Sequence, residues 1–213
     1  MKLTVNTFVS LDGVMQGPGG PEEDTAGGFE HGGWVVPFVD DDFGRIVNGW
    51  FAGADAILFG RTTYEMMASF WPQVTDESDP VAGALNRLPK HVVSTTLRDP
   101  VWGPVSVIAS DVEAAVRSLK QQPGRELQVH GSWGLVRTLH DAGLVDEYRL
   151  LQFPVVLGSG KRLFPEGAAP AGFELVDSSV TAAGLVHLVL RPAELRTGDI
   201  TVEDGQEVLH PAD

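Results

Sequence analysis

Short apolar segments that end in glycine or in a hydroxyl residue recur along the chain, and helical patterns lie between them. The clearest segment is Ala56-Ile57-Leu58-Phe59, which is followed directly by Gly60. A continuous apolar run of this kind is typical of a strand that is covered on both faces, as the strands of parallel sheets are. Strands that alternate with helices favour an α/β fold in which most strands run parallel.

The hydrophobic periodicity predicts where the strands and helices lie. Strands are expected at residues 3–11, 56–59, 91–95, 105–108, 127–130, 148–156, 173–181 and 184–190. Helices are expected at residues 43–51, 62–70, 114–119 and 135–140. The last two strands flank Ala182-Ala183-Gly184. We therefore predict a central mixed, mostly parallel sheet with helices on both faces and a C-terminal antiparallel hairpin at one edge.

Most of the net charge of −14 lies in two acidic segments. Residues 21–42 contribute −7 without any Lys or Arg, and residues 194–213 contribute −5. Because no basic stripe remains that could bind a phosphate backbone, nucleic-acid binding is not expected. The first segment overlaps a loop at residues 16–33 that is rich in glycine and proline. Trp34 follows this loop and has little local structure to bury it.

The length of 213 residues favours a single domain, which we expect at residues 1–191. Beyond it the periodicity fades, so residues 192–213 are either a loose acidic arm or an appended strand pair. The chain has no cysteine, which excludes disulfides, thiolate metal sites and a cysteine nucleophile. No apolar run has the length of a membrane span, and the N-terminus lacks the apolar core of a signal peptide. We expect a cytoplasmic protein that binds neither membranes nor nucleic acids.

Three junctions between a strand and the following loop are candidate ligand sites, at residues 60–65, 94–98 and 130–134. In open α/β sheets ligands bind beyond the carboxyl ends of strands, where helix N-termini favour anions. Each junction also has a purely structural interpretation. Thr62 or Thr63 with Glu65 could form a helix cap, the hydroxyl residues of the second junction could form a turn, and the glycines of the third could serve a turn as well.

Familiar catalytic and nucleotide-binding motifs are absent from the chain. There is no G-x-G-x-x-G, and residues 158–161 lack the other residues of a P-loop. Ser132 has no G-x-S-x-G frame, which disfavours a hydrolase. The six histidines are scattered without metal-site spacing, so no metal is expected.

The order of several short motifs resembles the dihydrofolate reductase-like superfamily, in particular the reductase domain of bacterial riboflavin biosynthesis deaminase–reductase proteins. The resemblance covers about residues 1–191. The matching motifs are Phe8-Val9-Ser10-Leu11-Asp12-Gly13, residues 57–65, residues 88–95, Val129-His130-Gly131-Ser132-Trp133-Gly134 and residues 143–160. It implies the three-layer fold of that superfamily, NADPH as hydride donor and a homodimer.

The resemblance also implies roles for residues at the three junctions. Gly60, Arg61, Thr62 and Thr63 would hold phosphate, and Arg61 would supply the charge that distinguishes NADPH from NADH. Ser94 and Thr95 would contact the adenosine 2′-phosphate. The residues expected along the pyrophosphate and at that end of the cofactor site are His130, Gly131, Ser132, Trp133 and Gly134. Relatives often carry a second glycine where this chain has Ser132.

The substrate pocket is expected where the sheet meets the facing loop, and its candidate residues are Asp12, Trp34, Phe38, Gln152 and Phe153. The proton donor is not identified. Asp12 and Asp41 are candidates, although residues 40–42 also fit a solvated cluster at a helix N-terminus. We predict an NADPH-dependent reductase that acts on a small pterin- or pyrimidine-like heterocycle or a carbonyl compound. The alternatives are a nucleotide-binding protein without turnover and an interaction protein that docks through its acidic tail.

Overall fold

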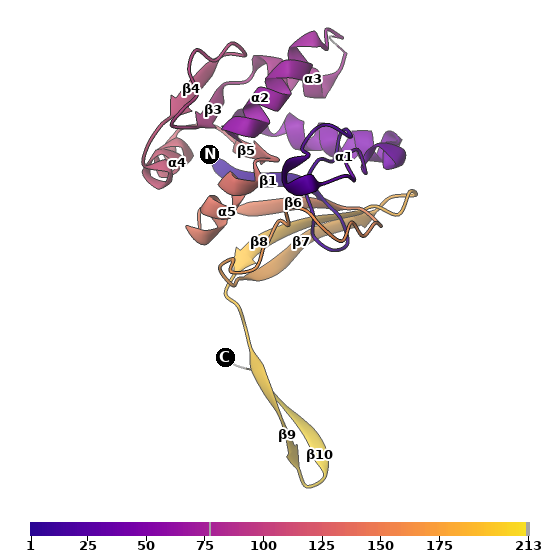
Figure 1. Cartoon of the computed structure of the whole chain (residues 1–213). Helices are drawn as coiled ribbons and strands as arrows, with labels where there is room; N and C mark the ends of the chain where they lie inside the picture. The colour runs from indigo at the N-terminus through magenta and orange to yellow at the C-terminus, as the bar shows by residue number, and fades with distance from the viewer. Residues whose placement is uncertain (77, 212–213) are drawn as a thin grey trace.

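The computed structural model describes residues 1–76 and 78–211. An eight-stranded sheet carries helices on both faces, and a separate two-stranded hairpin extends away from it (Figure 1). The sheet has the order β4-β3-β2-β5-β1-β6-β8-β7. Its strands are β1 (Lys2–Val9), β2 (Ala54–Gly60), β3 (Lys90–Val93), β4 (Val105–Ile108), β5 (Glu126–His130), β6 (Glu147–Gln152), β7 (Gly172–Val180) and β8 (Val186–Ala193).

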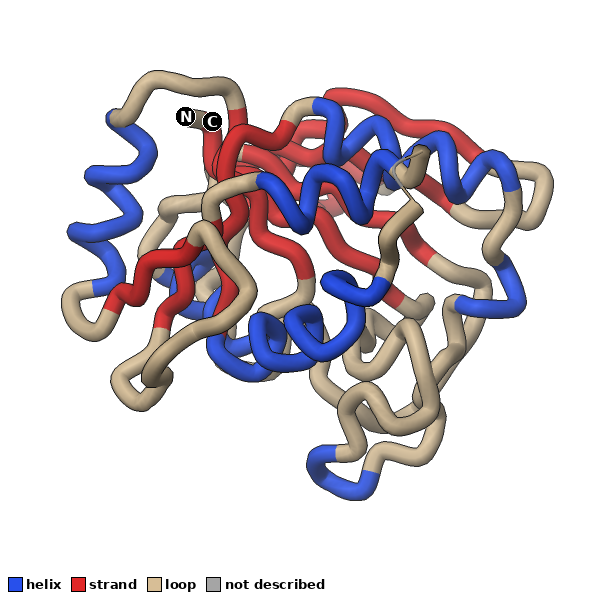
Figure 2. The backbone as a smooth tube through the Cα atoms, turned by 90° about the horizontal axis from the view of Figure 1, so that it is seen from above, coloured by secondary structure: helices blue, strands red, loops and turns tan. Residues whose placement is uncertain are grey.

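Six neighbouring strands, from β4 to β6, run parallel to one another. The last two, β8 and β7, are antiparallel and form one edge of the sheet. The predicted α/β fold with a mostly parallel sheet and an antiparallel C-terminal hairpin is therefore confirmed. Figure 2 shows the strands from above, with helices in front of and behind them.

Five α-helices form the two outer layers. Side chains of α1, α2 and α3 join one hydrophobic core cluster, and side chains of α4 and α5 join the second cluster on the other face of the sheet. The helices are α1 (Asp41–Ala52), α2 (Arg61–Phe70), α3 (Pro80–Arg87), α4 (Val112–Gln121) and α5 (Trp133–Asp141). Short 3₁₀ turns lie at η1 (Ala26–Gly28), η2 (Val36–Phe38) and η3 (Trp71–Gln73).

Local sequence signals account for most of these elements. In α1 the apolar residues Ile46, Val47 and Trp50 face the sheet, and the Asp40 carboxylate accepts a hydrogen bond from a first-turn N–H. The helix ends at Gly53, as predicted. Helix α3 was not predicted, because its eight residues include a proline and a glycine that weaken the helical pattern.

Two further differences concern the C-terminal half. The strand expected at residues 148–156 ends at Gln152, because Pro154 has no N–H to donate to a ladder. Beyond β8 the chain forms a strand pair, β9 (Gly198–Glu203) and β10 (Gln206–Pro211), which was one of the two alternatives expected for the tail. Residues 212–213 of that tail lie outside the described residues. In the described part of the chain, no helix combines the length and apolar character of a membrane span.

Candidate functional site

A cavity of about 1330 Å³ lies at the carboxyl ends of β1, β2 and β5. Helix α1 borders it on one side. On the other side it is bordered by the segment of residues 15–35, which we call the rim loop. The position agrees with the general rule that ligands of α/β sheets bind beyond the strand ends.

Two helices begin at this cavity, and neither has a side-chain cap. Helix α2 starts after Gly60 and α5 starts after Ser132, and no side chain accepts a hydrogen bond from their first-turn N–H groups. The other three α-helices are capped by the carboxylates of Asp40, Asp79 and Asp111. The free N–H groups and the helix dipoles of α2 and α5 can therefore bind an anion in the cavity.

Hydrogen bonds join the first junction to the third. The Gly60 N–H donates to Oγ of Ser132 over 3.0 Å, and the Ser132 N–H donates to Oγ1 of Thr63, also over 3.0 Å. Gly131 has a φ of +57°, and a Cβ atom there would approach the Thr63 methyl to 3.3 Å. A glycine is required at Gly131 for both reasons. Ser132 also adopts the left-handed conformation, and its side chain holds the two turns together.

The second junction reaches the first through Arg61. Its Nη1 donates to Oγ1 of Thr96 over 2.6 Å, while its Nε forms an ion pair with Glu65 at 2.9 Å. Thr96 lies in the second junction, but the family resemblance assigned the 2′-phosphate contact to Ser94 and Thr95 and not to Thr96. The Ser94 hydroxyl is largely buried and accepts hydrogen bonds from two backbone N–H groups of its own turn. Thr96 is therefore the hydroxyl residue that contacts Arg61. The sequence signal for it is the run of three hydroxyl residues at positions 94–96.

The predicted cofactor residues divide into two groups. Those of the first and third junctions border the cavity, namely Gly60, Arg61, Thr62, Thr63, His130, Gly131, Ser132, Trp133 and Gly134. Ser94 and Thr95 are not among the residues that line the cavity. Their contact with a cofactor stays a prediction.

His130 forms part of the cavity wall at the end of β5. Its ring stacks on Phe51 with the centroids 4.4 Å apart, and its Nε2 lies 3.0 Å from Oε1 of Gln128. The Gln128 amide nitrogen donates to the Trp50 carbonyl and to the Glu126 carboxylate, each over 2.6 Å. Since Oε1 of Gln128 can only accept, the proton of the His130 ring lies on Nε2. Nδ1 is then left as an acceptor without a partner among the described residues.

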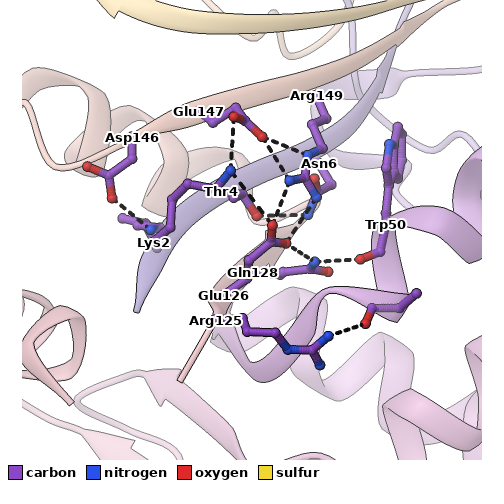
Figure 3. A network of polar contacts seen from close by, with 12 residues as sticks. Lys2, Thr4, Asn6, Trp50, Arg125, Glu126, Gln128, Asp146, Glu147 and Arg149 are labelled. Carbon is purple, nitrogen blue, oxygen red and sulfur yellow. Dashed lines mark hydrogen bonds and ion pairs between the residues drawn. The ribbon is translucent and has the colours of Figure 1, made fainter. Parts of the chain in front are cut away.

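Charges behind Gln128 stabilise this arrangement (Figure 3). Arg149 donates to Glu126 over 2.6 Å and also to Glu147, which pairs with Lys2 at 2.9 Å. Burial raises the pKa of Glu126, but the hydrogen bonds from Arg149 and Gln128 outweigh it and lower the pKa. The pKa of His130 is lowered to about 3 by burial and by the positive charge of Arg149. The ring is therefore neutral at physiological pH.

Asn6 adds a second unpartnered acceptor to the same wall. It lies opposite His130 in the β1–β5 register, and both residues line the cavity. Its Nδ2 donates to Thr4, whereas its buried Oδ1 has no hydrogen-bond partner in the described part of the chain. An unpaired buried acceptor is costly, so a ligand N–H donor at this wall would be favoured.

The predicted aromatic substrate residues lie beside the cavity, in and next to the rim loop, and their contact with a substrate stays a prediction. Trp34 is buried, donates from its Nε1 to the carbonyl of Gln16, and packs edge-on against Phe153 at 5.2 Å. Phe38 packs on the same ring at 5.6 Å. Phe153 has no exposed surface and supports the rim loop from below. Gln152 pairs with β8 and does not line the cavity.

The two proton-donor candidates also lie away from the cavity wall. Burial raises the pKa of Asp12, but hydrogen bonds from Ser10 and from the N–H groups of Leu157 and Gly158 outweigh it and lower the pKa to about 2. Asp12 is therefore ionised at neutral pH and its carboxylate stabilises a turn, and its role as a proton donor stays a prediction. Asp41 is exposed in the first turn of α1, as the solvated-cluster interpretation expects.

Glu23 is a carboxyl at the cavity that the sequence pattern did not single out. It lies in the rim loop and accepts hydrogen bonds from the N–H groups of Gly19 and Gly20. Burial raises the pKa of Glu23 above its usual value. Nothing in the sequence distinguishes it from Glu22 and Asp24 beside it, because its burial depends on how the loop folds.

Comparison with known proteins gives one family and a consistent fold. Residues 1–187 match the profile of the RibD C-terminal domain. Among curated proteins, YyaP of Bacillus subtilis, which is uncharacterised, is 26% identical over 88% of this chain and 93% of its own length.

Two solved structures share the fold at low sequence identity. A putative riboflavin biosynthesis protein from Shewanella sp. PV-4 is 21% identical, with a TM-score of 0.67 over 91% of this chain and all of the other. Dihydrofolate reductase from Enterococcus faecalis, solved with NADP(H), is 13% identical, with a TM-score of 0.57 over 91% of this chain and 97% of the other. The fold is therefore dihydrofolate reductase-like.

Proposed function

The chain belongs to the RibD C-terminal domain family, and from that premise we propose an NADPH-dependent reductase that transfers a hydride to a small, uncharged heterocycle or carbonyl compound. The family supports a reductase, and the cofactor and the substrate are the finer parts of the proposal. The observation that carries it is the pair of uncapped helix N-termini, α2 and α5, which are hydrogen-bonded to each other at one cavity.

The residues at this cavity suit a dinucleotide phosphate. The N–H groups that follow Gly60 and Ser132 can bind a pyrophosphate, and Gly131 lets the backbone approach it closely. Arg61 and Thr96 lie at one side of this cradle, where a guanidinium and a hydroxyl can bind the 2′-phosphate that distinguishes NADPH from NADH. When bound, the nicotinamide ring of the cofactor supplies the hydride.

Charge at the rim supports an uncharged substrate. Lys161 forms an ion pair with Asp24 at 2.6 Å, and Arg162 lies 3.7 Å from Asp12, so both nearby cations already have acidic partners. Glu22 adds further negative charge to the cavity. A phosphorylated substrate would be repelled here, whereas a neutral ring would not.

The polar and apolar parts of the wall then have separate roles. Phe8, Phe43 and Val47 give the cavity an apolar side that excludes water from a flat ring. Nδ1 of His130 accepts a hydrogen bond from an N–H group and orients it. Glu23, whose pKa burial raises, is the rim carboxyl best suited to hold a proton.

The proposal is tested by titrating the protein with NADPH and with NADH and following its tryptophan fluorescence, since Trp50, Trp71 and Trp133 all border the cavity. Arg61→Ala should weaken NADPH binding by about 10- to 100-fold, because a charge-assisted hydrogen bond contributes roughly 1.5–3 kcal/mol. NADH binding should change much less. Arg137→Ala is the matched control, since Arg137 also pairs with an acid one helical turn away, Asp141, but does not line the cavity. Equal losses for both cofactors in Arg61→Ala would contradict the 2′-phosphate assignment.

A nucleotide-binding protein without turnover is the second candidate. It is favoured by one observation, that the polar group at the inner wall, His130, is neutral and cannot donate a proton from Nδ1. Sustained NADPH oxidation with any pterin-like, pyrimidine-like or carbonyl compound would exclude it. Tight NADPH binding without oxidation across such a panel would support it over the reductase.

A further inference from the structure

The hairpin of β9 and β10, which we call the arm, makes no polar contact with the rest of the protein. It comprises residues 198–211 and follows a short linker, residues 194–197. In the described part of the chain, each of its hydrogen bonds and ion pairs joins two arm residues. Figure 1 shows the arm extending away from the sheet.

An isolated two-stranded hairpin of this kind is only marginally stable in water. The arm nevertheless carries three apolar side chains that are strongly exposed, Ile200 at 64%, Val202 at 76% and Leu209 at 65%. Ile200 lies opposite Leu209 in the register, and Val202 is two residues further along. Because side chains of a strand alternate between its faces, all three lie on the same face of the arm. This face would gain stability from being covered.

One carboxylate, Glu207, lies opposite Val202 on this same face, and the other charged side chains of the two strands lie on the opposite face. The register pairs Asp199 with His210 and Glu203 with Gln206, and these pairs belong to the opposite face. Asp204 is at the turn. The arm is therefore unequal on its two faces, with Ile200, Val202 and Leu209 beside a single carboxylate on one face and mostly polar side chains on the other.

The edge of the sheet offers such a surface. Strand β7 is the outermost strand, so one side of its backbone has no strand partner. Leu175 is 60% exposed and Val180 is 71% exposed. The register places Leu175 opposite Leu190 and Val180 opposite Val186, and the bulge after Leu175 keeps the two pairs on one face. An open edge strand with an apolar face is a site for association.

We propose that two copies of the chain form a two-fold symmetric dimer in which each arm packs its apolar face on the β7 edge of the other copy. Each chain supplies both an arm and an edge, so every contact occurs twice and the assembly closes at two copies. Two copies of the contact are needed because a specific interface buries about 800 Å² per partner. The face of one small hairpin has a smaller area than this. The arm lies beyond residues 1–187, and the β7 edge lies away from the cavity, so the proposal does not depend on reductase activity.

The test is the mass of the full chain in solution, by sedimentation or light scattering at about 1–100 μM, the range in which moderate affinities appear. The unmodified chain should be a dimer. Leu209→Lys should raise the dimer dissociation constant at least ~30-fold, because it puts a charge on the packed face. Gln206→Lys adds the same charge to the opposite face and should leave the dissociation constant unchanged. Far-UV circular dichroism should be the same for both variants, which checks that the body stays folded.

A mixing experiment separates this arrangement from any other dimer. The edge variant carries Leu175→Lys together with Val180→Lys, and it should dissociate as the Leu209→Lys variant does. A mixture of the two variants can form a heterodimer in which one arm and one edge are both intact. It should therefore associate at least ~10-fold more tightly than either variant alone. A monomeric unmodified chain at the highest concentration, or a mixture no tighter than its components, would overturn the proposal.

Discussion

The rim loop and the arm both carry clustered acidic residues. The rim loop is fixed to the body of the protein by buried side chains and hydrogen bonds, whereas the arm extends away from the body. In the rim loop Asp24 pairs with Lys161 at 2.6 Å, and Gln16 donates to two backbone carbonyls of the loop. Phe29 and Trp34 are buried beneath it. Among the described residues the arm shows no equivalent hydrogen bond or ion pair with the body, and its Ile200, Val202 and Leu209 are exposed. An acidic segment therefore becomes part of the cavity wall when buried aromatic side chains and amide hydrogen bonds fix it to the body. Its charge alone does not fix it there.

The largest expected effect comes from removing an aromatic anchor of the rim loop. Trp34→Ala should lower the free energy of unfolding by about 3–5 kcal/mol, because it leaves a cavity against Phe153 and removes the hydrogen bond to Gln16. Val208→Ala truncates an apolar side chain of the arm on the face opposite Leu209, and it should change the free energy by less than about 0.5 kcal/mol. Denaturant unfolding measures both values. Similar losses in the two variants would mean that the arm is part of the folded core.

Elements that follow from local sequence pattern could be predicted, whereas contacts between residues far apart in the sequence could not. The strand at residues 56–59 and the helix that ends at Gly53 follow from local pattern alone, and both were found. Trp34 was expected to be poorly buried because its neighbours in sequence are glycines. The residue that covers it, Phe153, is more than 100 positions away, so periodicity cannot reveal the contact.

The site shows the same limit. Gly60 and Gly131 could be singled out because strand ends followed by glycine have a clear pattern. The hydrogen bonds that join the two turns, and the pairing of Arg61 with Thr96, depend on the register of separate strands. The pKa of His130 is lowered first by burial and then by the charge of Arg149, which lies two strands away in the sheet. Contacts of this kind cannot be predicted until the strand order is known.

A smaller effect should follow from removing the amide anchor of the rim loop. The side chain of Gln16 is buried, and it accepts a hydrogen bond from the Lys161 N–H as well as donating to the loop carbonyls. Gln16→Ala should lower the free energy of unfolding by about 1–3 kcal/mol, since these backbone groups lose their partner. It should also speed proteolysis within residues 17–33.

The matched control is Gln206→Ala in the arm, whose side chain is exposed. We expect no measurable change in unfolding and no new cleavage in the rim loop. If Gln16→Ala were cleaved no faster than this control, the loop would be held by its aromatic residues alone. The difference between the rim loop and the arm would then be explained by the burial of Trp34 and Phe29 alone.

The smallest expected effect is a pH dependence, and it concerns Asp12 beside the rim loop. Hydrogen bonds lower the pKa of this carboxyl from 3.8 to about 2 despite its burial. A carboxyl with a lowered pKa stabilises the fold above its unfolded value, and that stabilisation is lost as the pH falls through the folded value. Stability should therefore fall between about pH 4 and pH 2, and the fall should be shallower in Asp12→Asn. Asp204→Asn makes the same change at the turn of the arm, where the described residues show no hydrogen bond or ion pair to the body, and it serves as the control. Denaturant midpoints measured at half-unit steps of pH compare the three proteins, and equal slopes in all three would show that Asp12 is no more tightly held than the acids of the arm.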